Sequence, residues 1–455
     1  MIRSLRYFLV WVVLATAPNW PALAQKGLLK SGPMLAWSDF RECAIWVQAQ
    51  KPAKVQVRYR IKGSDGPELR TAEVATADHL AHTATVVADQ VQPGKRYTYD
   101  VYLNSKKITL PYPTEFQAQE LWQFRKDAPA FTMAVGSCLY VNDSIYDRPG
   151  KGYGSDYQMM EVLAQAKPDA MLWLGDNTYT READWNTRTG ILHRYSHTRS
   201  LPQLQPLLAS THHYATWDDH DYGPNDADRS YWGKAMTSEI FSAFFPSMNT
   251  GLAGPGSKTS TFMWGDAQVF LLDDRWFRAP NDDKDPNRDY FGQVQLQWLK
   301  DALTGSRARF KIIANGGQLL NPVFEIAGDN GRKIELETLA RYPAERERFL
   351  KVLQESGASG IILLSGDRHH TSFQKMDRPG TYPLYELTAS SLTAGSHAPR
   401  NEPNPYVIPE TVVATHNAAL LSFSGPNSDR VLKITILKAD GGIAWTRELR
   451  AAELK

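Results

Sequence analysis

The segment AMLWLGDNTY, residues 170–179, joins a short apolar run to a cluster of polar side chains. Its first five residues are all apolar, which is typical of a strand that is buried on both faces of a sheet. Gly175 ends the run, and Asp176 and Tyr179 follow it. Because α/β folds carry their ligand sites on loops at the carboxyl ends of strands, this segment predicts an α/β fold with a functional loop at 175–179.

Further apolar runs of four or five residues accompany this segment, at 131–135, 214–217, 269–272, 310–314 and 361–364. Helical spacing of apolar residues is found at 158–165, 293–303 and 344–355. A final pair of strands is predicted at 431–437 and 443–449. Short buried strands that alternate with helices form an α/β pattern, so we assign residues 126–455 to one α/β domain.

The chain before this domain has a different pattern. Apolar residues alternate with polar ones from Val55 to Ile61, and turn residues separate such segments. No stretch between residues 26 and 125 has a helical period, so we predict an all-β sandwich domain over 26–125. The turn at 91–94 resembles the strand entry of a fibronectin type III domain, which makes this sandwich fibronectin III-like.

Composition excludes several classes of protein. The 455 residues are 42% hydrophobic and 22% charged, with a formal net charge of +2. These values exclude a disordered, collagen-like or coiled-coil chain. A near-neutral charge without blocks of like charge also argues against a nucleic-acid-binding surface. Because the chain has only two cysteines, Cys43 and Cys138, the fold does not depend on a set of disulfides.

Residues 1–24 are predicted to be a secretory signal peptide. Arg3 and Arg6 precede an apolar stretch at 7–15, and the tripeptide Ala-Leu-Ala at 22–24 has the pattern of a cleavage site. The apolar stretch is much shorter than the roughly 20 residues that a membrane span needs. We therefore expect an exported protein, periplasmic or extracellular, without a stable membrane anchor.

Four clusters of chemically reactive residues directly follow predicted strands. They are Gly136-Ser137-Cys138, Gly175-Asp176-Asn177-Thr178-Tyr179, Trp217-Asp218-Asp219-His220-Asp221-Tyr222 and Ser365-Gly366-Asp367-Arg368-His369-His370. Together they contain five carboxylates and three histidines. So many carboxylates in one place would repel one another and would be costly to bury, and bound cations are the simplest explanation. The clusters therefore predict a metal site.

In this order, the four motifs resemble those of the PhoD-like alkaline phosphatases, a family of the calcineurin-type metallophosphoesterase superfamily. Two looser elements, Asp-Asp-Arg at 273–275 and Tyr-Pro-Ala-Glu-Arg at 342–346, are also family-like. The preceding β domain matches the family as well, so the resemblance covers nearly the whole chain after residue 24. It implies a four-layer αββα metallophosphoesterase sandwich and a metal-dependent phosphoric ester hydrolase that works at alkaline pH.

The resemblance assigns a first metal ion, Fe³⁺, to Cys138, Asp176, Tyr179 and His369. A thiolate and a phenolate together favour a strongly Lewis-acidic ion, because a tyrosine must lose a proton near its ordinary pKa of about 10 to bind.

By the same resemblance, Asp176 bridges to a second metal, Ca²⁺, with Asp219 and Asp367 as further ligands. A carboxylate set suits a hard ion such as calcium. The family pattern implies one or two calcium ions. Asn315 and Gln318, which follow the predicted strand at 310–314, are weaker candidates for completing the oxygen ligands.

The metals imply in-line attack of a metal-activated water or bridging oxide on phosphorus. His220 is assigned to stabilisation of the transition state or to general acid catalysis, with a purely structural histidine as the alternative. Arg275 and Arg368 are candidates for pairing with phosphate oxygens, which suit a guanidinium fork. Further candidates for the phosphate pocket are Asn177, Asp221 and His370.

Several alternatives stay open at this stage. The substrate is expected to be a small-molecule or lipid-like phosphate ester, and a monoesterase and a dedicated phosphodiesterase of phospholipase D type both fit. A second class is an enzyme with a Cys138 nucleophile paired with His220 or His369. A third is an inert hydrolase body that carries a fibronectin-like binding module. A Cys43–Cys138 disulfide would remove the iron ligand, and we expect a monomer.

Overall fold

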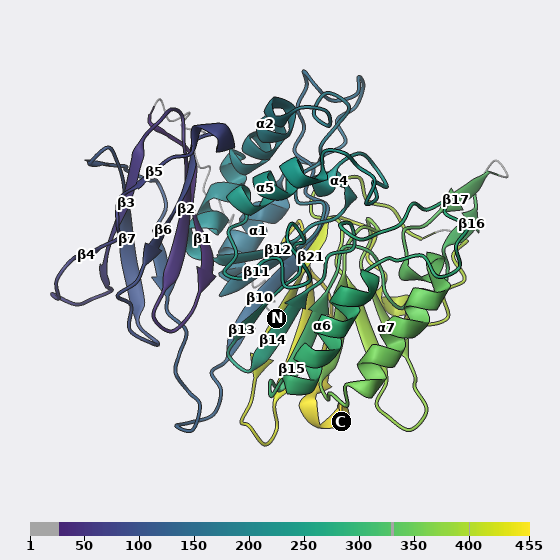
Figure 1. Ribbon diagram of the computed structural model, residues 1–455. Coiled ribbons are helices and arrows are strands. Elements are labelled where there is room, and N and C mark those ends of the chain that lie inside the picture. The colour runs from purple at the N-terminus through teal and green to yellow at the C-terminus, as the bar shows by residue number, and fades with distance from the viewer. Residues whose placement is uncertain (1–26, 329–331, 400) are drawn as a thin grey trace, which may run out of the picture.

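Two large β-sheets packed face to face form the centre of the structure (Figure 1). The computed structural model describes residues 27–328, 332–399 and 401–455. The larger sheet has nine strands, in the spatial order β23 (Ile443–Arg450), β22 (Val431–Lys438), β21 (Asn417–Ser424), β10 (Phe131–Gly136), β11 (Ala170–Leu174), β12 (His212–Thr216), β1 (Leu29–Ser38), β2 (Cys43–Ala49) and β6 (Thr83–Ala88). The second sheet has six, in the order β13 (Ser260–Trp264), β14 (Ala267–Leu271), β15 (Phe310–Ala314), β18 (Ile361–Ser365), β20 (Leu384–Thr388) and β19 (Ser372–Met376).

The central strands of the larger sheet, β10, β11 and β12, are buried on both faces. In β11, Leu172 and Leu174 face the core between the two sheets, whereas Met171 and Trp173 pack on the opposite side, under the helices. Successive side chains of a strand point to opposite faces, so an unbroken apolar run is needed where both faces are covered. This explains why the central strands could be recognised as continuous apolar runs.

Helices cover the outer faces of both sheets (Figure 1). On the larger sheet these are α1 (Gln158–Ala166), α2 (Arg188–Arg199), α3 (Gln205–Ser210) and α5 (Lys234–Phe244), and on the second sheet they are α6 (Gly292–Gly305) and α7 (Pro343–Glu355). A single-turn helix, α4 (Asp219–Tyr222), follows β12. The predicted α/β class is therefore confirmed, and the layers follow the order α, β, β, α.

The N-terminal strands form a β-sandwich that shares a sheet with the α/β part. Its second sheet contains β4 (Leu69–Arg70), β3 (Lys54–Ile61), β7 (Arg96–Leu103) and β8 (Lys106–Lys107), with β5 (Val74–Ala75) on β3 and β9 (Glu115–Gln117) on β7. Strand β1 of the first sheet pairs in parallel with β12, where Leu35 lies opposite His212. The Tyr99 hydroxyl donates to the Ala209 carbonyl at 2.8 Å. The sandwich is thus built onto the edge of the larger sheet. A separate two-stranded ribbon consists of β16 (Glu325–Ala327) and β17 (Lys333–Glu335).

The apolar pattern located the central strands more reliably than the helices. Strands β11 and β15 have the predicted bounds, and α6 and α7 begin one residue before the predicted segments. Helices α2, α3 and α5 were not predicted. Helix α2 buries Arg194 and Arg199 on its inner face, which breaks the apolar stripe from which a helix is recognised.

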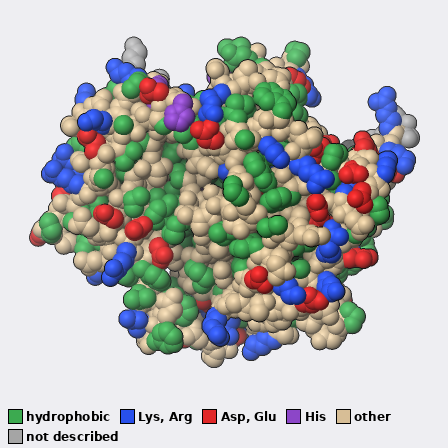
Figure 2. Space-filling view, in the orientation of Figure 1, with side chains coloured by type: hydrophobic (Ala, Val, Ile, Leu, Met, Phe, Trp, Pro, Cys, Tyr) green, Lys and Arg blue, Asp and Glu red, His purple; other side chains and the backbone are tan. Residues whose placement is uncertain are grey.

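Within the described residues, no helix is both long and apolar enough to cross a membrane. On the face shown in Figure 2, acidic and basic side chains are interspersed among apolar ones.

Strand β12 buries two neutral histidines. The Trp173 indole donates to His213 Nδ1 at 2.9 Å, so that nitrogen is unprotonated, and Nε2 lies 3.3 Å from the Leu207 carbonyl. Burial and the nearby Arg199 charge lower the pKa of His213 to about 3, and burial lowers the pKa of His212 to about 4. Both side chains therefore pack within the core rather than face solvent.

These pKa values predict that acid destabilises the fold. Below about pH 6.5 these histidines bind protons in the unfolded chain but stay neutral in the folded chain. The free energy of unfolding therefore decreases as the pH is lowered. In a His213→Gln variant, the slope of this fall between pH 7 and pH 5 should be smaller by up to about 1.4 kcal/mol per pH unit. Denaturant unfolding at several pH values measures both slopes. Equal slopes for wild type and His213→Gln would contradict the assignment of a neutral buried histidine.

Candidate metal centre

The four predicted clusters meet at one edge of the two packed sheets. Strands β10, β11 and β12 run parallel, as do β14, β15 and β18, so the loops after these strands emerge on the same side of their sheets. The loops are also bonded to one another. The Leu139 amide donates to the Asp176 carbonyl at 2.8 Å, and the Gly366 amide donates to the Gly316 carbonyl at 2.7 Å.

The backbone is tightly constrained at the candidate ligands. Cys138, Asp176, Asp367 and His369 have φ values of 61°, 52°, 64° and 55°. Residues other than glycine rarely adopt this left-handed conformation, and where they do, the surrounding structure must hold them there. Gly175 also has a positive φ, 86°, and a Cβ atom there would lie 2.5 Å from Cβ of Asp218. Glycine therefore allows the second and third clusters to approach closely.

The candidate first-metal ligands lie together. One donor atom each from Cys138, Asp176 and His369 falls within 4.8 Å of the others. The Tyr179 hydroxyl donates to Asp176 Oδ2 at 2.9 Å and lies 3.2 Å from His369 Nε2. Cys138 Sγ lies 3.7 Å from Asp176 Oδ2 and accepts a hydrogen bond from Ser390 Oγ at 3.1 Å. A thiol, a carboxylate, a phenol and an imidazole thus converge on one point.

A second group of donors adjoins the first through Asp176. Donor atoms of Asp176, Asp219 and His220 lie within 4.8 Å of one another. The His220 amide lies 3.4 Å from Asp176 Oδ1, and Nδ1 of its buried ring has no hydrogen-bond partner among the described residues. Asp219 Oδ2 accepts from the Asp226 amide at 2.8 Å. Asp176 is therefore placed between two sets of donors.

Without cations, this arrangement disfavours the ionised forms of the acidic side chains. Burial raises the pKa of Asp176 well above its ordinary value, and the nearby Asp219 and Cys138 raise it further. Burial and the Glu337 carboxylate raise the pKa of Asp367 to about 6, against the effect of Arg368. Burial also raises the pKa of the Cys138 thiol to about 11, although hydrogen bonds from Ser137 and Ser390 oppose the shift. The residues therefore fit a site in which metal ions supply the missing positive charge.

A third acidic group was not foreseen from the sequence. Donor atoms of Asp218, Asp219 and Glu337 also lie within 4.8 Å of one another. Glu337 follows the β16–β17 ribbon rather than a central strand, so no strand-end pattern marked it. Arg275 lies across this group, with Nε 2.7 Å from Asp218 Oδ1 and Nη2 2.7 Å from Glu337 Oε2.

Arg275, predicted from the sequence to contact phosphate, lies buried among acidic side chains. Its side chain is fully buried, and each of its nitrogens already donates to Asp218, Glu337 or the Ala227 carbonyl. Arg275 instead balances the acidic charge of Asp218 and Glu337.

Asn177 and Asp221, the other candidates for the phosphate pocket in these loops, are hydrogen-bonded to each other. Both are fully buried, and Asp221 Oδ2 accepts from the backbone and the side-chain amide of Asn177, each at 3.2 Å. The Asn177 side chain also donates to the Thr216 carbonyl at 2.8 Å. Together they join the loop after β11 to the loop after β12. They support the candidate ligands from behind rather than facing a substrate.

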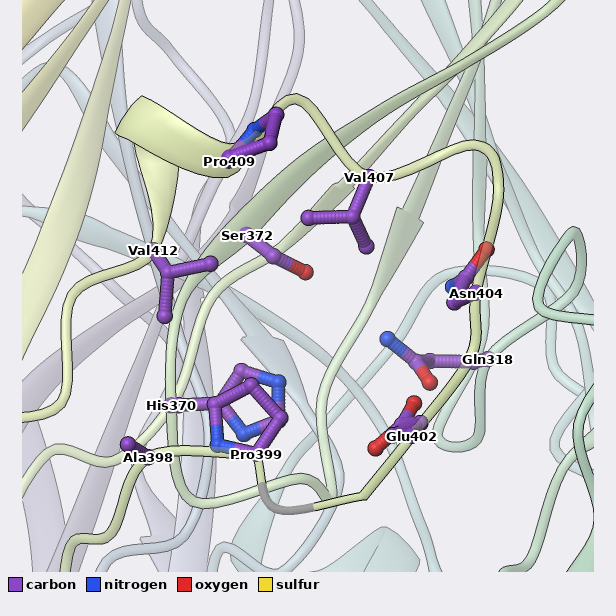
Figure 3. A pocket seen from close by; sticks show the side chains of 10 residues that line it. All are labelled: Gln318, His370, Ser372, Ala398, Pro399, Glu402, Asn404, Val407, Pro409 and Val412. Atoms are coloured by element: carbon purple, nitrogen blue, oxygen red, sulfur yellow. The ribbon is translucent and has the colours of Figure 1, made fainter.

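His370, the neighbour of the candidate ligand His369, lines a cavity. Figure 3 shows this pocket, of about 390 Å³, with His370 on one side and Gln318 and Glu402 on the other. Arg368 Nη1 donates to Gln318 Oε1 at 2.9 Å, and Nη2 donates to Glu402 Oε2 at 2.8 Å. Arg368 is therefore paired with a carboxylate that the sequence did not indicate. Gln318 and His370 line this pocket, and neither is in the three donor groups described above.

Asn315, the other weaker metal candidate, lies beneath the site. It is fully buried, and its amide donates to Asp274 Oδ2 at 3.0 Å and to the Gly317 carbonyl at 2.8 Å. Its Oδ1 has no hydrogen-bond partner among the described residues.

Tyr153 is a further contact of the centre that sequence reasoning missed. Its hydroxyl lies 3.1 Å from His369 Nδ1 and so fixes the orientation of the imidazole. Tyr153 comes from the loop between β10 and α1, where no motif surrounds it.

The two cysteines are free thiols, which excludes the alternative Cys43–Cys138 disulfide. Cys138 is fully buried, and its raised pKa opposes a role as an exposed nucleophile.

Comparisons with known proteins agree with this architecture. The model of the PhoD-like phosphatase family matches residues 133–431, and that of a domain of unknown function, DUF7800, matches residues 26–121. Alkaline phosphatase D from Bacillus subtilis (strain 168) is 25% identical to the chain over 381 residues. That alignment covers 70% of this chain and 59% of the relative, so the chain spans less than two thirds of the relative's length.

Two solved structures share the fold. A structure of PhoD superposes with a TM-score of 0.74 at 17% identity, covering 96% of this chain and 93% of that one. The purple acid phosphatase PPD1 from yellow lupin (Lupinus luteus) seeds gives a TM-score of 0.65 at 13% identity, covering 92% of this chain and 74% of that one. Because the phosphatase family model spans well over half of the chain, and the four motifs meet in one site, the chain belongs to the PhoD-like phosphatase family.

Proposed function

We propose that the protein is a metal-dependent phosphoric ester hydrolase whose centre holds two kinds of metal ion. The observation that carries this proposal is the position of Asp176. It belongs both to the group with Cys138 and His369 and to the group with Asp219 and His220. A carboxylate shared by two adjacent donor sets is the arrangement that bridges a pair of metal ions.

The donor sets suggest different ions. Cys138, Asp176, Tyr179 and His369 would hold Fe³⁺, since thiolate and phenolate favour a strongly Lewis-acidic ion. Asp176, Asp219 and Asp367 would hold Ca²⁺, which prefers carboxylate oxygens. When bound, the metals would polarise the phosphoryl group and supply a nucleophile by lowering the pKa of water.

Side chains of the protein would then position the ester and stabilise the leaving oxygen. His220 lies at the second donor set, and burial lowers its pKa, so its ring is neutral above neutral pH. In that state it serves either as a ligand through one nitrogen or as a hydrogen-bond donor to the phosphate. Ser390 and Tyr153 hold Cys138 and His369 in place.

The substrate class follows the family. Phosphate monoesters and diesters, including lipid-like diesters, are both within the proposal, and a dedicated phosphodiesterase of phospholipase D type is its narrower form. We further propose that residues 1–24, which lie outside the described residues, are a signal peptide directing export to the periplasm or the medium. We also propose that residues 26–125 form a fibronectin III-like domain. The protein is proposed to be a monomer.

Turnover of matched chromogenic monoester and diester substrates at alkaline pH tests the function directly. The purified, metal-loaded protein should hydrolyse at least one of them, lose activity on chelation and regain it when calcium is added back. The ratio of the two rates distinguishes a phosphatase from a phosphodiesterase. Absence of turnover on both, with metal confirmed by elemental analysis, would refute the proposal.

The shared carboxylate should be indispensable. Asp176→Asn should lower bound metal and reduce kcat/KM by more than roughly 100-fold, beyond the effect typical of outer-shell partners. Elemental analysis and kinetics on the same preparation measure both. Asp377→Asn, at a carboxylate with 81% of its side chain exposed, is the control and should leave both unchanged. Full activity in Asp176→Asn would exclude a bridging role.

The two cysteines provide a matched test of the iron assignment. Both thiols are free and buried, but only Cys138 lies at the site. Cys138→Ser should lower the iron content while sparing calcium, because a hydroxyl is a poorer partner than a thiolate for this ion. Cys43→Ser should retain wild-type iron. Unchanged iron in Cys138→Ser, measured by elemental analysis, would contradict the thiolate role.

A further inference from the structure

Arg181 lies beside the candidate metal centre, two residues after Tyr179, and has no part in the roles assigned above. Its backbone amide donates to Asp184 Oδ2 at 2.8 Å, and its Nε donates to the Tyr140 hydroxyl at 3.1 Å. These two bonds fix both the start of the side chain and one edge of the guanidinium.

Three tyrosine rings surround the guanidinium of Arg181. Its central carbon lies 4.8, 5.8 and 5.7 Å from the ring centroids of Tyr140, Tyr153 and Tyr179. The rings also pack on one another, with centroids 5.1 Å apart for Tyr140 and Tyr153 and 5.0 Å apart for Tyr140 and Tyr179. Aromatic faces attract a cation without neutralising it. The cradle therefore holds Arg181 in place and leaves its charge available.

The same rings belong to the metal centre. The Tyr179 hydroxyl contacts Asp176, the Tyr153 hydroxyl contacts His369, and the Tyr179 ring lies 4.3 Å from the ring of His220.

Arg181 differs in this respect from the other arginines near the site. Arg275 and Arg368 each pair with a buried carboxylate, Glu337 and Glu402 respectively. Among the described residues, neither terminal nitrogen of Arg181 has a hydrogen-bond or ion-pair partner, and the side chain is only half-buried. Its guanidinium is thus held by aromatic rings, and both terminal nitrogens lack a partner among the described residues.

We propose that Arg181 binds a non-bridging oxygen of the substrate phosphate and favours dianionic monoesters over monoanionic diesters. This inference rests on the proposed function and specifies its substrate preference. At alkaline pH a phosphate monoester carries nearly two negative charges, because its second pKa is about 6. A diester carries only one, so an additional unpaired cation attracts the monoester more strongly. A guanidinium also matches the geometry of phosphate oxygens.

Replacement of the charge tests this preference in the metal-loaded enzyme. Arg181→Gln should lower kcat/KM for the monoester by about 10- to 100-fold, the effect of losing a charge-assisted hydrogen bond, and for the diester by clearly less. The inhibition constant of inorganic phosphate should rise by a similar factor. Arg181→Lys, which keeps the charge, should recover part of the monoester preference.

The control replaces a neighbouring arginine that is exposed. Arg148 pairs at the surface with Glu182, the residue that follows Arg181 in the chain. The Arg148 side chain is 70% exposed. Arg148→Gln should retain the wild-type ratio of monoester to diester turnover and the wild-type phosphate affinity.

Two outcomes would overturn the inference. One is an unchanged ratio and phosphate affinity in Arg181→Gln. The other is an equal loss on both substrates together with lost metal, which would mean that Arg181 only supports Tyr179. Failure of the proposed function is distinguishable, because the wild-type protein would then hydrolyse neither ester. In that case calorimetric titration of inorganic phosphate into wild type and Arg181→Gln still tests the contact, and equal affinities would refute it.

Discussion

Mutual repulsion of carboxylates at one edge of the two sheets is the constraint on which the arrangement of the site depends. Asp176, Asp218, Asp219 and Glu337 are brought together by loops whose backbone positions are fixed by the strands behind them. Burial of such a group is unfavourable unless positive charge is supplied. The protein supplies part of it through Arg275, and the remaining donors are arranged for metal ions.

This constraint explains why arginines at the site have different roles. Arg275 lies within the acidic cluster and forms ion pairs with Asp218 and Glu337. Arg368 is paired with Glu402, next to the pocket that contains Gln318. Only Arg181, among these three, is held by aromatic faces instead of a carboxylate. The three arginines therefore differ in the groups that hold their guanidinium, a carboxylate for two of them and aromatic rings for the third.

The sequence could predict the parts of the site that depend on local pattern. Cys138, Asp176, Asp219 and Asp367 follow apolar strands, and parallel strands bring the ends of such loops together. The partners of each side chain depend on the tertiary fold, so the sequence could not supply them. Asn177 and Asp221, for example, are buried and hydrogen-bonded to each other. Glu337, Glu402 and Tyr153 reach the site from irregular segments without any strand-end signal, and the N-terminal strands gave no sign that they would extend the larger sheet.

That shared sheet has a consequence for how such chains can be rearranged. The sandwich is joined to the α/β part through the parallel pairing of β1 with β12, the strand that leads directly into the Asp218–Tyr222 segment. Two units connected only by a linker can be exchanged between homologues or separated without affecting either core. Here a chimaera joined between residues 121 and 133, where one matched family model ends and the other begins, would have to preserve the pairing of β1 with β12. The two parts therefore depend on the fit between β1 and β12, which lie far apart in the sequence. The Ser38 amide contacts the Tyr214 hydroxyl at 3.1 Å across a separation of 176 positions.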